Sequence, residues 1–365
     1  MKLIALKDVC KINMGQSPNS SSYNDYGDGM PFFQGNADFG ERYPITRVWC
    51  NTPTKIAQAE DILISVRAPI GALNYAKEEC CIGRGLAAIT PDRNKVSQDF
   101  IYWALKGKKA ELNDKGNGST FKAISRKILE ETMIPDINFE QQHKCAENLE
   151  KIYGIIQNRR KELLALDDLI KARFVEMFGD SASNEKGWKM NTFGDICTVR
   201  QGLQIPISKR LTEYEEDSYE YITVQYLHGG KEKEYIKSPK ESVKCTKDDI
   251  LMTRTGNTGM VVTNVEGVFH NNFFLIDFDR ERFEKDFLVE YLNLDLIQAD
   301  ITRRAGTSTI PDLNHGEFYK IKVFEPPIDL QKEFDEFKMQ VDKSKLMFQK
   351  LHQKLNILQK KAGDI

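Results

Sequence analysis

The sequence predicts a fold of the α/β (α+β) class, in which two tandem globular domains with many short strands are separated by two long helices that form an antiparallel coiled coil. Three observations support this prediction. Short motifs recur in the same order at an offset of about 190 residues, each half ends in a long heptad pattern, and short β-branched apolar runs fill the remainder. A chain of 365 residues has room for two such domains.

The sequence contains an internal duplication. Four segments match between the halves, at offsets that stay between 187 and 191 residues. Matches in a constant order are typical of a repeated structural unit. In chain order, the pairs are Leu6–Cys10 with Gly15 and Phe193–Cys197 with Gly202; Asp61–Ser65 with Gly71 and Asp249–Thr253 with Gly259; Gly116–Thr120 and Ala305–Thr309; and Pro135–Gln141 and Pro326–Lys332.

Each half should therefore hold one globular domain followed by one helical spacer. We expect the first globular domain over residues 1–138 and the central helical spacer over 139–180. The second globular domain is expected over 181–328, and the C-terminal helical spacer over 329–365.

Short apolar runs predict the buried strands of each domain. In the first half, Ile62–Val66 and Leu86–Ile89 are continuous apolar segments bounded by acidic, Gly or Pro residues. In the second half, Ile250–Thr253 and Phe273–Ile276 have the same character. Runs of this length between turn signals are typical of strands that are buried on both faces.

The two long helices are predicted by apolar residues that step by three and four positions. Heptads sustained over about four repeats indicate a coiled coil, with helices roughly 58 and 50 Å long at 1.5 Å per residue. Each seam needs a partner, and we expect the two seams to pair with each other; the alternative is that each pairs with a helix of another protein. The main seam positions are Leu149, Ile156, Leu163, Ile170, Phe334, Val341, Phe348 and Leu355, and Arg159, Arg173 and Ser344 interrupt them.

Composition excludes several classes of protein. No apolar run approaches the roughly 20 residues that a membrane span requires, and the charges at Lys2, Lys7 and Asp8 do not fit a signal peptide, so we expect a cytoplasmic protein with no membrane partner. The 7 cysteines are scattered and contain no C-x-x-C pair, so neither a disulfide framework nor a metal site is expected.

The sequence also lacks the motifs of the obvious DNA enzymes. It contains no glycine-rich phosphate loop and no Asn-Pro-Pro-aromatic element, so neither a P-loop ATPase nor an adenine methyltransferase is expected. Pro311-Asp312 with Glu336 and Lys338 formally matches a nuclease motif, but Glu336 and Lys338 flank a predicted coiled-coil residue, Phe337. We therefore expect no catalytic residue in this chain.

The whole set of motifs resembles the specificity subunits of type I restriction-modification systems. The resemblance covers essentially the whole chain and rests on the ordered duplicates, with Asp61–Ser65 and Gly71, Gly83–Ile89, and Gly256–Gly259 as its strongest strings. It implies two target-recognition domains that each read one half of a split asymmetric DNA target, and helices that set the half-site spacing and dock two methylation subunits. It also implies restriction/translocase subunits, and places S-adenosylmethionine, ATP and Mg in partner subunits, with no cofactor in this chain.

Base reading and phosphate contacts require amide, hydroxyl and basic side chains on exposed loops. The loops of each domain supply such residues close to the repeated motifs. In the first domain, the predicted DNA-binding residues are Gln34, Asn36, Arg67, Arg84 and Lys122; in the second, they are Gln225, Arg254, Asn257 and Thr258, with His270, Asn271 and Asn272 in the position that corresponds to Arg84.

Local charge predicts how tightly the chain alone binds DNA. Residues 1–138 carry 18 basic and 16 acidic groups, whereas residues 181–328 carry 19 and 24. Because phosphate neutralisation supplies most non-specific affinity, we expect weak DNA binding by the isolated chain. Two alternatives remain open at this point: a coiled-coil scaffold protein without a DNA role, and a stand-alone nuclease or methyltransferase with unfamiliar motifs.

Overall fold

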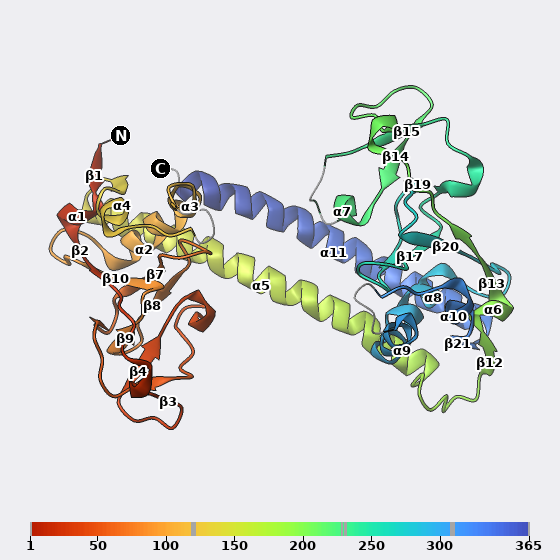
Figure 1. Ribbon diagram of the computed structural model, residues 1–365, viewed down its shortest axis with the longest axis horizontal. Helices are drawn as coiled ribbons and strands as arrows, with labels where there is room; N and C mark the ends of the chain where they lie inside the picture. The colour runs from red at the N-terminus through yellow and green to blue at the C-terminus, as the bar shows by residue number, and fades with distance from the viewer. Residues whose placement is uncertain (1, 118–121, 228, 230–231, 307–310, 364–365) are drawn as a thin grey trace. The chain divides into compact units, whose positions relative to one another are not determined.

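The computed structural model describes residues 2–117, 122–227, 229, 232–306 and 311–363, with side chains described up to residue 349. The chain divides into two compact units (Figure 1). Unit 1 comprises Met1–Lys161 and Phe348–Ile365, and unit 2 comprises Glu162–Met347. The predicted loop residues Ser119 and Thr120, and Ser308 and Thr309, lie outside the described part of the chain.

The first half of the chain contributes eleven strands and five α-helices to the described structure. They are β1 (Leu3–Ala5), α1 (Leu6–Val9), β2 (Cys10–Met14), β3 (Tyr23–Asn24), β4 (Met30–Phe33), β5 (Trp49–Cys50), β6 (Ile56–Ala57), β7 (Ile62–Ser65), β8 (Leu73–Tyr75), β9 (Cys80–Ile82), β10 (Leu86–Pro91), α2 (Gln98–Gly107), α3 (Lys109–Asp114), α4 (Arg126–Glu130), β11 (Met133–Pro135) and α5 (Phe139–Phe178).

The second half repeats much of this order. Its elements are β12 (Lys189–Thr192), α6 (Phe193–Ile196), β13 (Cys197–Gln201), β14 (Ser218–Ile222), α7 (Val224–Leu227), β15 (Tyr235–Lys237), β16 (Lys244–Cys245), β17 (Ile250–Thr253), β18 (Val261–Val262), β19 (Gly267–Phe269), β20 (Phe273–Phe278), α8 (Lys285–Asn293), α9 (Asp295–Ala305), α10 (His315–Tyr319), β21 (Lys322–Glu325) and α11 (Ile328–Gly363).

The sheets confirm the duplication that the motifs predict. A four-stranded antiparallel sheet has the order β2-β10-β7-β8 in unit 1 and β13-β20-β17-β18 in unit 2. A two-stranded ladder, β1-β11 in one half and β12-β21 in the other, lies just before each long helix in the chain. In each unit a further sheet contains one parallel pair, β4 with β9 or β14 with β19. The architecture is therefore α+β, with mainly antiparallel sheets.

The predicted strands form because both faces of the four-stranded sheet are covered. Along β7, Ile62 and Ile64 face the core that packs against α2, while Leu63 faces the smaller core beneath the second sheet. Successive side chains of a strand point to opposite faces, so a strand between two cores must be apolar at every position. β10, β17 and β20 contain the other three predicted strands, which are confirmed.

The backbone conformation after β7 and after β17 explains why a glycine is repeated at this position. Gly71 and Gly259 both have positive φ, of 82° and 88°. At Gly259 a Cβ atom would lie 2.8 Å from the Ile301 side chain, and at Gly71 it would lie 3.1 Å from that of Lys109. A residue with a side chain would be strained in both turns, so the repeated spacing marks a backbone requirement.

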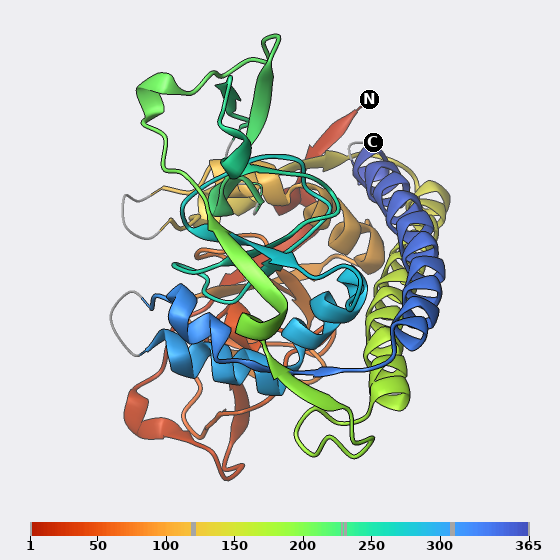
Figure 2. The same ribbon diagram turned by 90° about the vertical axis from the view of Figure 1, so that its right-hand side faces the viewer.

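Two phenylalanines of α5 and one of α11 form the centre of the helix pair in unit 2. Phe174, Phe178 and Phe334 are fully buried, with ring centroids of Phe174 and Phe334 5.4 Å apart. Ion pairs join Arg173 to Glu333 and Asp167 to Lys345, so the α5 number falls as the α11 number rises. The segments are therefore antiparallel, side by side in Figures 1 and 2.

The heptad prediction is correct in its middle and needs correction towards the end of α5. Ile170, Phe334 and Val341 are buried in the unit 2 core, and Ile156 is buried in unit 1. Arg173 is half-buried and ion-paired, and the neighbouring Phe174 occupies the core position instead. A straight helix drifts by about 20° per heptad, so a strict seven-residue repeat leaves the true contact face within a few turns.

The remaining seam positions have different surroundings in the two units. Leu149 packs into the core of its own domain, in the cluster that includes Trp103. Leu163 is half-buried in unit 2. In unit 1, the Arg159 guanidinium lies 4.8 Å from the ring centroid of Phe348. The side chain of Leu355 lies outside the described residues.

The counterpart of Leu149 in the second half is a buried charge. At an offset of 189 residues stands Lys338, whose ammonium lies 3.1 Å from both Asp286 and Glu290. Glu290 in turn occupies the position of Trp103. At this one position the contact between long helix and domain is therefore apolar in unit 1 and ionic in unit 2.

One glutamine near the start of each long helix is the same in both units. Gln142 and Gln331 are buried, 3% and 0% exposed. The side-chain oxygen of each accepts a hydrogen bond from the backbone N–H of a helix N-cap residue in the same domain. The donor to Gln142 is Ser97, the N-cap of α2, at 2.7 Å, and the donor to Gln331 is Glu284, the N-cap of α8, at 2.9 Å. Their amide nitrogens donate to carbonyls just before the long helices. Each glutamine therefore fixes its long helix to its domain.

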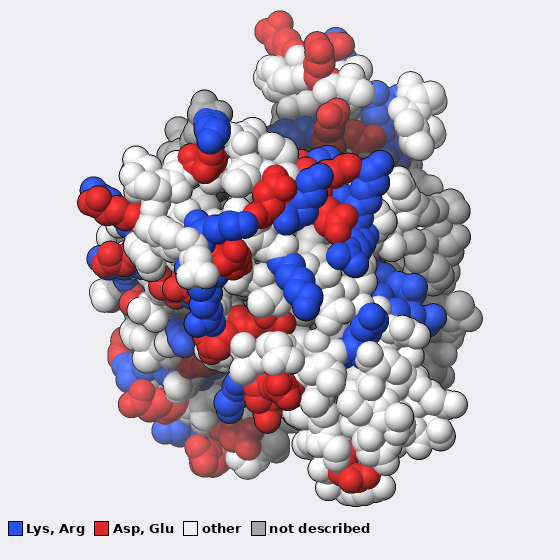
Figure 3. All heavy atoms as spheres, turned by 90° about the vertical axis from the view of Figure 1, so that its left-hand side faces the viewer, with Lys and Arg blue, Asp and Glu red and all other residues white. Residues whose placement is uncertain are grey.

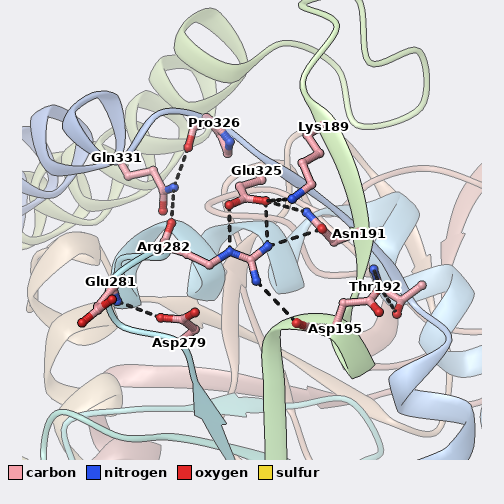
Figure 4. Close-up of polar contacts among 10 residues, drawn as sticks. All are labelled: Lys189, Asn191, Thr192, Asp195, Asp279, Glu281, Arg282, Glu325, Pro326 and Gln331. Carbon is pink, nitrogen blue, oxygen red and sulfur yellow. Dashed lines mark hydrogen bonds and ion pairs between the residues drawn. The ribbon is translucent and has the colours of Figure 1, made fainter.

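A partly buried ionic cluster stabilises the same region of unit 2 (Figure 4). Glu325 at the end of β21 accepts hydrogen bonds from Nε and Nη2 of Arg282, at 2.8 and 2.7 Å, and another from Asn191 at 2.9 Å. Lys189 adds an ion pair at 3.2 Å. The hydrogen bonds from Arg282 lower the pKa of Glu325 to about 2. This cluster joins the two-stranded ladder to the end of β20.

Candidate nucleic-acid interface

In unit 1, backbone hydrogen bonds bring several loops together at one end of the four-stranded sheet. The N–H of Val66 donates to the carbonyl of Gly85 at 2.9 Å, and that of Gly85 donates to the carbonyl of Gln34 at 3.1 Å. On the other side, Ile124 donates to Val66 at 2.9 Å, and Arg67 and Ala123 form a β-bridge. This set of bonds, which we call the loop frame, unites segments that lie up to about 90 residues apart.

The loop frame brings together four of the five residues predicted in the first domain. Gln34, Arg67, Arg84 and Lys122 lie on it or next to it, and all four are exposed. Within the described part of unit 1, none of the three cations forms an ion pair. Asn36 begins a short 3-10 helix two residues after Gln34 and is half-buried. This end of the sheet therefore presents unpaired positive charge beside amide groups, the combination that DNA contacts require.

Charge over the rest of unit 1 is mixed. Figure 3, which faces the side of the molecule where unit 1 lies in Figure 1, shows basic and acidic side chains interspersed. No single basic face stands out on this side. DNA affinity from this unit would then depend on a few local cations rather than on a broad positive surface.

Unit 2 repeats most of the loop frame with different side chains, although the N–H of Asn272 donates to the His270 side chain where that of Gly85 donates to Gln34. The N–H of Arg254 donates to the carbonyl of Asn272 at 2.7 Å, and that of Leu313 donates to the carbonyl of Arg254 at 2.9 Å. Thr255 forms a β-bridge with Asp312, as Arg67 does with Ala123. His270–Asn272 therefore lies where Gly83–Gly85 lies in unit 1, which is the correspondence expected from the sequence.

Among the described residues, Arg254 forms an ion pair, in contrast to Arg67, Arg84 and Lys122 of unit 1. Its Nε and Nη2 donate to the two carboxylate oxygens of Asp312, at 2.9 and 2.8 Å, and its Nη1 donates to Gln201 at 3.1 Å. The imidazole Nε2 of His315 lies 2.8 Å from the same Gln201 oxygen. Hydrogen bonding by Arg254 lowers the pKa of Asp312, and burial lowers the pKa of His315. These four side chains form what we call the Arg254 network.

Sequence reasoning missed three members of this network. Gln201, Asp312 and His315 come from β13, from the segment before α10 and from α10 itself, and none of them belongs to a repeated motif. Asp312 was noticed only as part of the formal nuclease match. An alignment of the two halves could have found them, because they are polar residues at positions where the two halves differ.

Several other predicted residues of the second domain hold the backbone in place. Thr258 donates to the carbonyls of Arg254 and Pro311, both at 3.1 Å. The side-chain oxygen of Asn272 accepts from Thr255 at 3.0 Å. The Thr258 hydroxyl and the side-chain oxygen of Asn272 therefore stabilise the loop backbone in this conformation.

The remaining predicted residues have mixed environments. The Nδ1 atom of His270 accepts a hydrogen bond from the backbone N–H of Asn272 at 3.0 Å, and burial lowers the pKa of this histidine. The Oδ1 atom of Asn271 is buried and has no hydrogen-bond partner among the described residues. Asn257 and Gln225 are exposed, Asn257 in the turn after β17 and Gln225 on α7.

The structure separates the residues of the formal nuclease match. Asp312 pairs with Arg254, whereas Lys338 on α11 pairs with Asp286 and Glu290 on α8. Across the described residues, no group of three or more His, Cys, Asp or Glu side chains is placed to hold a metal ion. The described helices also include none that is both long enough and apolar enough to span a bilayer.

Comparison with known proteins places the loop frame in a family. The family model for the type I restriction modification DNA specificity domain matches residues 1–165 and 185–357, one match to each half of the chain. The chain belongs to this family. Both matches contain the residues of one loop frame and most of one long helix, so the family unit corresponds to the repeated unit of the structure.

Two relatives from Methanocaldococcus jannaschii are similar in sequence. The MjaX specificity subunit of a type I restriction enzyme is 47% identical over 152 residues, which cover 42% of this chain and 36% of that protein. The MjaIX specificity subunit is 26% identical over 251 residues, covering 62% of this chain and 57% of its own length. The chain thus spans less than two thirds of either relative.

A solved structure supports the fold over nearly the whole chain. The S subunit of a type I restriction-modification system from M. genitalium aligns with a TM-score of 0.61, covering 99% of this chain and 94% of that one. The sequence identity is 17%, so this similarity concerns the fold alone. It confirms the predicted arrangement of short strands and long helices in two repeats.

Proposed function

We propose that the chain is the DNA sequence-specificity subunit of a type I restriction-modification complex. Each globular domain reads one half of a split, asymmetric DNA target, and the long helices set the spacing between the half-sites and dock two methylation subunits. The observation that carries this proposal is the loop frame, because the Val66–Gly85 and Ile124–Val66 bonds and the Arg67–Ala123 bridge of unit 1 all have counterparts in unit 2, with different side chains on them.

The difference between the two frames has a direct reading in terms of specificity. Where unit 1 has Arg67 and Arg84, unit 2 has Thr255 and Asn271. Base identity is read by the donors and acceptors that side chains present to the grooves. Two frames of one shape with unlike side chains are suited to two unlike half-targets, and a mere scaffold would not require them.

The proposal assigns no catalysis to this chain. Adenine methylation with S-adenosylmethionine, and ATP- and Mg-dependent DNA cleavage and translocation, belong to the methylation subunits and to the restriction/translocase subunits. The chain requires no cofactor of its own, binds double-stranded DNA, and works in the cytoplasm, where its target is.

The charge of the chain suggests that the methylation subunits supply much of the affinity for DNA. The second globular domain carries more acidic than basic groups, and its Arg254 is already paired. We expect the isolated chain to bind duplex DNA much more weakly than the chain assembled with its methylation subunits. Equal affinities in a gel-shift titration at matched salt would contradict this expectation.

The decisive test is methylome sequencing of a naive host that expresses the cognate methylation subunit with and without this chain. We expect methylated adenines in a split motif only when the chain is present. Arg84→Ala should change one half of the motif, whereas Lys151→Ala, which removes an exposed lysine of α5 in the same unit, should change neither.

The two alternatives give different results in the same host. A scaffold without a DNA role would assemble with the methylation subunit and yield no new motif. A stand-alone methyltransferase would produce methylation without any partner, and a stand-alone nuclease would cut unmodified DNA when supplied with a divalent metal ion.

A further inference from the structure

We propose that Arg254 reads a guanine in the half-target of unit 2, and that Asp312, Gln201 and His315 are positioning residues that hold its guanidinium for this contact. The inference rests on the proposed function and assigns a residue and a base within it.

The hydrogen bonds of Arg254 leave a suitable pair of donors. A guanidinium has five N–H donors. Among the described residues, three are used: Nε and one on Nη2 by Asp312, and one on Nη1 by Gln201. One N–H therefore remains on each terminal nitrogen. Those two nitrogens are the ones that an end-on bidentate contact uses, and guanine offers the matching acceptors, O6 and N7, in the major groove.

The network also fixes the plane of the guanidinium. The Gln201 amide nitrogen donates to the carbonyls of Asn271 and Phe273, at 2.6 and 3.3 Å, so its oxygen must face Arg254. His315 contacts that oxygen through Nε2, and since an amide oxygen only accepts, Nε2 carries the proton. Every member of the network thus has one orientation. A side chain held in this way loses little rotamer freedom when it binds a base.

The duplication shows that the fold does not require this network. The backbone bonds on either side of Arg254 are present in both units: Val66 donates to Gly85 as Arg254 donates to Asn272, and Ile124 donates to Val66 as Leu313 donates to Arg254. In unit 1 the four equivalent positions carry none of the four side chains. The pairs are Gln201 and Met14, Arg254 and Val66, Asp312 and Ala123, and His315 and Arg126.

In unit 1, moreover, Val66 is buried in the domain core and Met14 packs against it. An apolar pair at these sites therefore supports the same backbone. The polar network is a property of unit 2 alone, which is what a determinant of its half-target must be.

The pairing with Asp312 favours a base over a phosphate. A carboxylate bound side-on to the guanidinium compensates its charge, which weakens attraction to the phosphate backbone. The two remaining donors still discriminate by geometry, because adenine presents one acceptor and one donor where guanine presents two acceptors. The unpaired Arg67, Arg84 and Lys122 of unit 1 have no such carboxylate among the described residues.

The test uses the full chain in the methylome assay, with Arg254→Gln and Asp312→Asn. Glu333→Gln serves as a matched control, because it breaks another inter-element arginine–carboxylate pair of unit 2, with Arg173. We expect the half-target of unit 2 to contain a guanine. Arg254→Gln should reduce discrimination at that one position by about tenfold or more. Asp312→Asn should weaken the same position in the same sense, and Glu333→Gln should leave every position unchanged.

Three outcomes would overturn the inference. They are a half-target without guanine, a uniform loss of methylation at all sites in Arg254→Gln with no change at any one position, and an unchanged motif in both variants. Asp312 is 44% exposed, so Asp312→Asn is expected to fold even if Arg254→Gln does not. Absence of any split motif with the unmodified chain is a different result, since it refutes the proposed function itself.

Discussion

Replacing Asp335 with Asn should stabilise unit 2 near neutral pH. This carboxylate lies on α11, partly buried, and its Oδ1 atom is buried with no hydrogen-bond partner in the described part of the chain. Burial, together with the nearby carboxylates of Asp286 and Glu284, raises its pKa to about 7, although Lys338 and Lys285 oppose the shift. Ala146 stands at the equivalent position in unit 1, so no charge is needed there.

The sign and size of the effect follow from proton linkage. Because the folded pKa lies above the ordinary value of 3.8, the folded state binds more protons between about pH 4 and pH 7, and stability falls as the pH rises through this window. A difference of about three pKa units corresponds to about 4 kcal/mol, which is an upper limit for a partly exposed group. Asp335→Asn should remove this slope and stabilise the protein by up to that amount at about pH 8.

Urea unfolding of the full chain at about pH 5, 6.5 and 8 measures the effect, with circular dichroism as the readout. The unmodified chain should lose stability in its unit 2 transition over this range, and Asp335→Asn should not. Glu336→Gln, at the adjacent exposed position of α11, is the control and should follow the unmodified chain. A parallel pH dependence in Asp335→Asn and the unmodified chain would refute the reasoning.

Three further predictions concern other parts of the fold. Gln331→Leu should destabilise unit 2 by about 1–3 kcal/mol in urea unfolding, because it leaves the N–H of Glu284 buried without a partner; an unchanged midpoint would contradict the role of this glutamine. The depressed pKa of Glu325 contributes stability above about pH 4.5 that is lost as the pH falls towards 2, so Glu325→Gln should flatten acid unfolding in that range. Among the cysteines, only Cys145 is not fully buried, so a thiol reagent should modify it first and Cys145→Ser should abolish the fast phase.

Local patterns carried the prediction of the fold. The strands around Ile62 and Ile250 could be predicted because burial on both faces demands apolar residues at every position, and the turn glycines Gly71 and Gly259 because their backbone has positive φ. These requirements act over a few residues and therefore leave a readable pattern. Phe174 was missed because the contact face of a long helix drifts away from a strict heptad.

The candidate site could be predicted only in part. Arg67 and Arg84 stand next to repeated motifs, and the loop frame brings them together as expected. The partners of Arg254 could not be found in this way, since Gln201 lies 53 residues before it and Asp312 lies 58 residues after it. Pairings over such distances depend on how the strands are ordered in the sheet, which spacing along the chain does not reveal.

The unlike contacts at Leu149 and Lys338 bear on how a duplicated chain avoids assembling incorrectly. If α11 docked on the first domain, the Lys338 ammonium would keep a carboxylate at the position of Asp286, where Asp99 stands, but would meet Trp103 in place of Glu290. If α5 docked on the second, Leu149 would leave the partly buried Asp286 and Glu290 without the Lys338 ammonium. Either exchange would be unfavourable, because it would lose an ion pair that the observed docking makes. The two halves share one topology, but these contacts favour docking of each long helix on its own domain while the chain folds.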